Sequence, residues 1–194
     1  MVPSVFSGVS SETFQKFKSQ LALDPGSIIN NDRATYRLVD RDGSYGVTIG
    51  DQFDIAIKNG PDGFVNVKSV ISLENSLTIS VQTLKGHPDA GMNTFSVNYD
   101  PLTQELTWQT NNVSRTNDNY TGGIGAGVAS ARSKQQQQWK DVAIQAHSSL
   151  GFPIVKSATA EVKEFDYNDR TNTTGAEEKD ESFTQNFKSS FPKK

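Results

Sequence analysis

The sequence predicts an α+β fold: a curved antiparallel sheet of about six to seven strands that grips one long C-terminal helix, with a short N-terminal helix. Between residues 36 and 110, apolar side chains alternate with polar ones, as they do in strands with one buried face. Turn-forming residues interrupt this alternation at regular intervals, which is typical of strands joined by hairpins. Helical periodicity precedes this region and, over a longer stretch, follows it.

The short helix is expected near the N-terminus. Ser10 and Ser11 can cap it, and Phe14, Phe17 and Leu21 then fall on one face at spacings of three and four. The Asp-Pro-Gly segment of residues 24–26 would end it, because proline and glycine break helices.

Three segments give the clearest strands, since their inward positions alternate without a break. These positions are Leu77, Ile79, Val81 and Thr83; Phe95, Val97 and Tyr99; and Leu106, Trp108 and Thr110. Each strand therefore presents one face to the core and one to water. Irregular apolar residues over 154–167 are compatible with a further edge strand.

The longest helical pattern follows the glycine-rich segment of residues 122–127. Its apolar stripe spans residues 128–150, and a helix of this length needs an apolar surface to lie against. The inner face of the predicted sheet offers that surface. If the two layers pack in this way, Trp108, Tyr99 and Trp139 would face one another.

Composition excludes several classes of function. A net charge of -3 argues against a protein that neutralises nucleic-acid phosphates or anionic lipid. The chain has no Cys and only two His, so disulfide, thiol and zinc chemistry have few candidate residues. No apolar run approaches the span of a bilayer, and a secretion-signal pattern is absent. We therefore expect a soluble, cytoplasmic protein with no nucleic-acid or membrane partner, no metal and no cofactor.

Domain organisation follows from where the apolar residues stop. We expect one folded domain over residues 1–167 and a polar, disordered tail over residues 168–194, which contain no Leu, Ile, Val or Met. Phe183, Phe187 and Phe191 recur every four residues in this tail, the spacing of a short helix that docks on a protein partner. The alternative is a solvated tail with scattered phenylalanines.

The turn between two predicted strands holds the clearest titratable group. It reads Gly-His-Pro-Asp-Ala-Gly over residues 86–91, and His87 can act there as a general base or ligand donor oriented by Asp89. The alternative is an ordinary turn, because turns collect these residue types.

Aromatic and basic residues supply the other candidates. Trp108 and Tyr99 either pack in the core or stack on a ligand. Arg115 lies where the open end of the sheet meets the loop to the long helix, and it can pair with an anionic group or simply be exposed.

Three segments resemble a known family. Residues 83–97 (TLKGHPDAGMNTFSV) resemble the TLxGHPExGxxxFxV stretch of the DUF1990 (UPF0548) family. Residues 106–115 are similar to the family strand that ends in Ser-Arg, and residues 50–53 (GDQF) resemble its strand start. The chain departs from the family pattern at residues 92–93, where an acidic pair is usual, and lacks the proline after Arg115.

The resemblance covers about residues 45–150 and implies a helix-grip, START-like (SRPBCC) fold. It implies no catalytic residue, because the family has no settled reaction.

Together these patterns predict a binding module that holds a small apolar or amphipathic ligand in a cavity between the sheet and the helix of residues 128–150. Trp108 and Tyr99 would supply stacking surface, while Arg115 and His87 at the rim would orient a polar end of the ligand. Two alternatives stay open: an enzyme that uses the same cavity with His87 as acid and base, and an interaction protein that acts through its C-terminal tail.

Overall fold

The computed structural model describes residues 4–40, 46–58, 62–85, 87, 89–116, 126–151, 158–163 and 184–189. Its helices and strands are, in chain order, β1 (Ser4–Ser7), α1 (Ser11–Leu23), α2 (Gly26–Ile29), β2 (Ala34–Asp40), β3 (Gln52–Ile57), β4 (Gly63–Leu73), β5 (Ser76–Thr83), β6 (Asp89–Asp100), β7 (Glu105–Thr116), α3 (Ala126–Ser149), β8 (Ala158–Lys163) and β9 (Thr184–Ser189).

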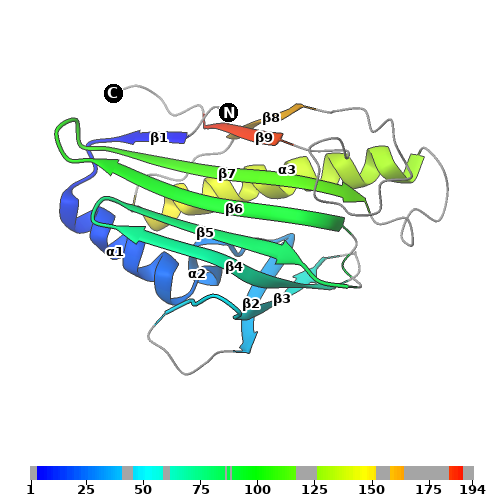
Figure 1. Ribbon diagram of the computed structural model, residues 1–194. Coiled ribbons are helices and arrows are strands. Elements are labelled where there is room, and N and C mark those ends of the chain that lie inside the picture. The colour runs from blue at the N-terminus through cyan, green and yellow to red at the C-terminus, as the bar shows by residue number, and fades with distance from the viewer. Residues whose placement is uncertain are drawn as a thin grey trace.

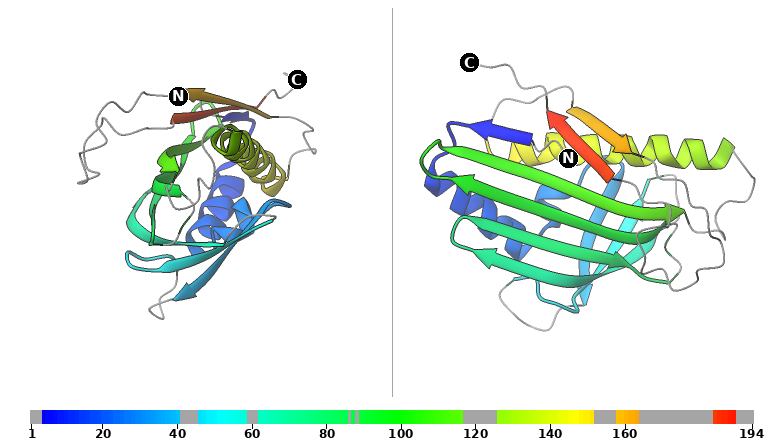
Figure 2. Two further views of the ribbon diagram at one scale, coloured as in Figure 1. Left: turned by 90° about the vertical axis from the view of Figure 1, so that its right-hand side faces the viewer. Right: turned by 45° about the horizontal axis from the view of Figure 1, so that its top comes forward.

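Seven strands form one antiparallel sheet in the order β1-β7-β6-β5-β4-β3-β2 (Figure 1). Strands β2 to β6 each pair with the next strand along the chain, which confirms the predicted meander. The sheet curves, and all three helices lie on its concave side (Figure 2). We call this side the inner face. The predicted α+β class with a curved antiparallel sheet is therefore confirmed.

Helix α1 forms for the local reasons that its sequence gives. The Ser10 hydroxyl accepts a hydrogen bond from the backbone N–H of Thr13 at 3.1 Å, which caps the helix. Phe14, Phe17 and Leu21 are its buried residues. Phe14 stacks on Tyr99 with ring centroids 4.8 Å apart, so α1 packs directly on the inner face.

Two short elements were not expected. Strand β1 places Phe6 opposite Leu106 and so joins the chain's first strand to its seventh. Helix α2 follows α1 after a break of two residues and buries Ile28 and Ile29. Both elements are only four residues long, too short for a recognisable period.

At β2, the strand at the opposite edge of the sheet from β1, two asparagine side chains accept hydrogen bonds from backbone N–H groups. The Asn30 side-chain oxygen accepts a hydrogen bond from the backbone N–H of Tyr36 at 2.6 Å. The Asn31 side-chain oxygen lies 3.3 Å from the N–H of Ala34 and 2.9 Å from that of Arg33. These N–H groups are thereby satisfied without a further strand.

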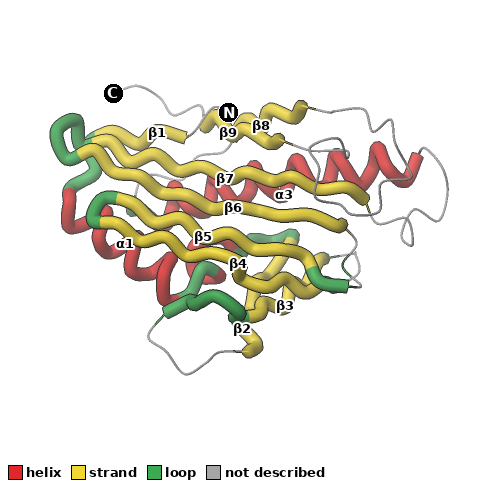
Figure 3. The backbone as a smooth tube through the Cα atoms, viewed as in Figure 1, coloured by secondary structure: helices red, strands yellow, loops and turns green. Residues whose placement is uncertain are grey.

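Helix α3 lies along the sheet on the inner face (Figure 3). From residue 137 onward the predicted stripe positions Trp139, Val142, Ala146 and Leu150 are buried, and so are Ala143 and His147. The stripe side chains before residue 137 lie outside the described ones. No helix in the described part of the chain is long and apolar enough to cross a membrane.

The C-terminal part differs from the expected tail at residues 184–189. These residues form β9, which pairs with β8 in a separate two-stranded sheet and contacts β7 and α3. Phe187 thus lies in a strand, opposite Ala160, and not in a helix. Pairing supplies backbone hydrogen bonds that a composition argument cannot anticipate. Phe183 and Phe191 lie outside the described residues.

The packing of α1 leads to a stability prediction. Replacing Phe17 with Ala removes a side chain that is 1% exposed and should lower the free energy of unfolding by about 3–5 kcal/mol. The matched change Lys16→Ala, one residue earlier, removes an exposed ion pair with Glu12 and should lower the free energy of unfolding far less. Urea unfolding of both variants tests this, and equal losses would contradict the packing.

Candidate ligand-binding site

Trp108 and Tyr99 lie in the packed core. Trp108 is fully buried and makes an edge-to-face contact with Phe17, at 5.8 Å between ring centroids. Tyr99 stacks on Phe14, and its hydroxyl donates a hydrogen bond to the Val9 carbonyl at 3.0 Å. Tyr99 and the two tryptophans thus belong to one buried core, in which the rings of Tyr99 and Trp108 contact α1.

The ring of Phe95 contacts both tryptophans. Its ring centroid lies 6.1 Å from that of Trp108 and 6.1 Å from that of Trp139. The sheet and α3 thus meet through a continuous aromatic contact at this level of the fold.

The apolar half of the interior leaves little room. Its cavity has a volume of about 10 Å³ and is lined by apolar side chains that include Ile29 and Phe95, together with Tyr36. Such a volume holds about one water molecule. Burial raises the pKa of Tyr36 to about 12, so its phenol stays neutral. An apolar ligand beside Trp108 would require the surrounding side chains to move.

Beyond Phe95 the inner face of β6 and β7 becomes polar. Asn93 is 8% exposed, Thr110 1% and Asn112 6%. Asn93 lies directly opposite Asn112, and Thr110 lies opposite Phe95. We call these three residues, Asn93, Thr110 and Asn112, the polar strip.

The polar strip carries unsatisfied oxygens. Within the described part of the chain, the side-chain oxygens of Asn93, Thr110 and Asn112 have no hydrogen-bond partner. Leaving a buried polar group without a partner costs about 1–3 kcal/mol. Such groups in a folded protein usually meet water or a ligand. The strip is therefore the strongest candidate for a binding surface.

Helix α3 runs over the strip. The ring of His147 lies 5.5 Å from that of Phe6, whose strand partner is Leu106, whereas Trp139 contacts Phe95 opposite Thr110. The eight residues of α3 from His147 back to Trp139 span about 12 Å, and the four residues of β7 from Leu106 to Thr110 span about 13 Å. Helix and strand therefore run alongside each other over this stretch, in opposite chain directions. The turns of α3 that precede Trp139 therefore run level with Asn112.

His87 anchors the turn that precedes β6. It is 8% exposed, and its Nδ1 lies 3.0 Å from the backbone N and 2.8 Å from the backbone O of Asp89. Its ring packs on Gly63, where an added Cβ would come within 2.2 Å of the ring. Burial lowers the pKa of His87, which favours the neutral imidazole.

Asp89 begins β6 and shares the inner-face register of Asn93, four residues later. Burial raises the pKa of its carboxyl group to about 6. This group can therefore gain or lose a proton near neutral pH.

Arg115 pairs through its backbone with Ala90 at the open end of β7, and its side chain lies outside the described ones.

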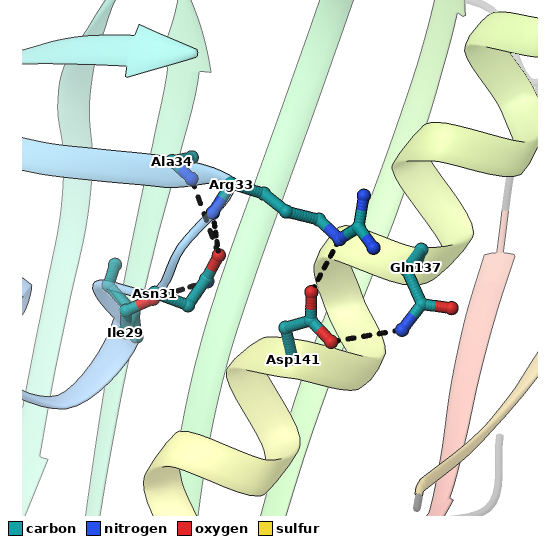
Figure 4. Close-up of polar contacts among 6 residues, drawn as sticks. All are labelled: Ile29, Asn31, Arg33, Ala34, Gln137 and Asp141. Carbon is teal, nitrogen blue, oxygen red and sulfur yellow. Dashed lines mark hydrogen bonds and ion pairs between the residues drawn. The ribbon is translucent and has the colours of Figure 1, made fainter. Parts of the chain in front are cut away.

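A different arginine connects the segment before β2 to α3. The Nε of Arg33 donates to Asp141 at 2.6 Å, and Gln137 donates to the other carboxylate oxygen at 2.9 Å (Figure 4). No sequence signal links these residues, which are 108 positions apart in the case of the ion pair.

The polar strip left a signal in the sequence. Thr110 and Asn112 continue the alternation of Leu106 and Trp108 but replace apolar side chains at inward positions. A change of polarity within one strand face marks a site where burial conflicts with packing. In the described residues, no group of three or more acidic, His or Cys side chains could hold a metal ion.

The contact between Gly63 and His87 gives a prediction. Gly63→Ala should lower the free energy of unfolding by about 1–3 kcal/mol, because its new methyl group overlaps the imidazole. Adding His87→Ala removes the overlap, so the double variant should lose less stability than the two single variants lose in total. Urea unfolding of the three variants measures this coupling, and strictly additive losses would refute it.

The raised pKa of Asp89 predicts a pH dependence. The folded state holds this proton up to about pH 6, whereas the unfolded chain releases it near pH 3.9. The stability that Asp89 contributes is thus present at low pH and lost as the pH rises through about 6. Relative to Asp89→Asn, the wild type should become less stable between about pH 4 and pH 7. Denaturant midpoints that differ by a constant amount across this range would contradict the shift.

Comparison with known proteins identifies one family. The family model described as a domain of unknown function (DUF1990) matches residues 48–145, just over half of the chain. This match includes β3 to β7, the polar strip, the His87 turn and most of α3. Neither curated proteins nor solved structures give a match. The chain belongs to the DUF1990 family.

Proposed function

We propose that this protein binds a small amphipathic molecule between the sheet and α3. The observation that carries the proposal is the polar strip, whose three side chains are buried by more than nine-tenths and have unsatisfied oxygens in the described part of the chain. A bound molecule that donates hydrogen bonds would remove this cost.

The arrangement of the elements supports a helix-grip, START-like classification. A strand and two helices precede the meander, and α3 follows it on the concave side of the sheet. In such a two-layer fold, the space between helix and sheet is where a ligand can be enclosed.

The position of the strip argues for an amphipathic molecule. On the apolar side of the interior, Trp108 is fully buried against Phe17 and Phe95, and the cavity lined by apolar side chains that include Phe95 has a volume of only about 10 Å³. The strip adjoins Phe95 and Trp139, so polar groups of the ligand would meet Asn93 and Asn112 while apolar groups contact these rings. The proposed ligand therefore sits further along β7 than Trp108 and Tyr99, where the sequence suggested stacking.

Native mass spectrometry of the purified protein tests the proposal. We expect a co-purifying small molecule on the wild type and a reduced bound fraction on Asn112→Leu, because leucine keeps the branching of the buried asparagine side chain but removes its polar group. The matched control Asn98→Leu changes an exposed residue of the same strand pair, opposite Thr107, and should retain the molecule. A wild type that carries no molecule, even after incubation with cell extract metabolites, would contradict the proposal.

A second candidate is an enzyme that acts on the same ligand. Asp89 favours it, because its carboxyl group lies on the face of β6 that also bears Asn93 and its pKa is raised to about 6. In that case wild-type protein should change the mass of the released ligand, and Asp89→Asn should not. His87 then holds the turn that positions Asp89.

A further inference from the structure

The second half of β4 has a free edge. β4 pairs with β5 up to its last residue, but its pairing with β3 covers only residues 63–66. Val67 is the last residue engaged on the β3 side: its N–H donates to the Asp51 carbonyl at 2.8 Å, and its carbonyl accepts from the Gly50 N–H at 3.0 Å. In the described part of the chain, residues 68–73 therefore have no strand on that side (Figure 1).

The backbone of this free edge offers groups for a further strand. Leu73 pairs with Ser76 across a two-residue turn, and such a flanking pair exchanges its backbone hydrogen bonds across the hairpin. The direction of hydrogen bonding alternates along a strand, so Val70 and Ser72 direct their N–H and C=O groups away from β5. An unpaired row of such groups is a template on which another strand can form.

Exposed apolar side chains accompany the free edge. Ile71 is 55% exposed and Leu73 63%, and both lie on the convex face of the sheet, opposite Thr78 and Ser76. Proteins commonly protect an open edge with charged residues or proline, and residues 69–73 (SVISL) contain neither. Backbone pairing and apolar contact are thus offered at the same place.

The limits of the free edge select a register with a second copy of the chain. The edge is bounded by Val67 and by the turn that begins at Glu74, so its midpoint is Ile71. Antiparallel pairing of two copies about this midpoint places Ile71 opposite its own copy and Lys68 of each chain directly opposite Glu74 of the other. Within the described residues, neither the Lys68 nor the Glu74 side chain forms an ion pair.

We propose that two copies of this chain associate through the free edges of β4 and form one continuous antiparallel sheet across a two-fold axis. Backbone hydrogen bonds, apolar contact among the Ile71 and Leu73 side chains, and two reciprocal Lys68–Glu74 ion pairs hold the copies together. An unrelated extended segment offers the same backbone groups, but a second copy also presents both charges in the required order. The polar strip takes no part in this contact, so the dimer is independent of the proposed ligand.

Sedimentation equilibrium of the full chain tests the proposed dimer. We expect a monomer–dimer equilibrium for the wild type, and Ile71→Lys should weaken it at least roughly tenfold, because it sets two positive charges side by side at the two-fold axis. Met92→Lys is the matched control. Met92 is 47% exposed, but it lies on β6, which is paired on both sides, so this variant should dimerise like the wild type.

Reversing the charges tests the register. Lys68→Glu and Glu74→Lys each place like charges opposite one another and should weaken the dimer about tenfold. The double variant restores opposite charges in exchanged positions and should recover most of the wild-type affinity. A monomeric wild type, or a dimer that Ile71→Lys leaves unchanged, would refute the edge contact. A double variant as weak as the single variants would refute the register.

Discussion

A series of four aromatic rings in contact connects α1, the sheet and α3. Phe17 of α1 meets Trp108 of β7, Trp108 meets Phe95 of β6, and Phe95 meets Trp139 of α3. Each ring buries a large apolar area, and each pair adds a geometric preference to that burial. These ring contacts fix where α1 and α3 lie on the sheet. The remaining packing, including the level of α3 along β7, follows from these contacts.

This series of aromatic rings divides the inner face into two halves with different properties. On one side the face is apolar and filled, so it contributes hydrophobic stabilisation. On the other side, Asn93, Thr110 and Asn112 are buried without stabilising pairs in the described residues. A protein that tolerates such a cost at one place often does so because that place serves binding. The apolar half can then be regarded as the scaffold that keeps the polar half in position.

Local patterns in the sequence were sufficient for much of this architecture. The cap and apolar face of α1, the meander, and the C-terminal stripe of α3 all depend on neighbours in the chain. The pairing of β1 with β7, the short α2 and the Arg33–Asp141 ion pair depend on distant segments, so no periodicity could reveal them. Tyr99 and Trp108 were correctly placed inside, but only coordinates show that their rings are used by α1. The polar strip was visible as a break in polarity whose meaning required the position of α3.

The hydrogen bonds that Asn30 and Asn31 accept from the edge of β2 have a consequence for solubility in crowded conditions. An outermost strand with free N–H groups is a template on which another molecule can extend the sheet, the first step toward aggregation. Here the N–H groups of Ala34 and Tyr36 are already engaged by asparagine side chains of the same molecule. The end of β2 that adjoins α2 is thereby protected against intermolecular strand addition without needing a proline or an additional charged residue.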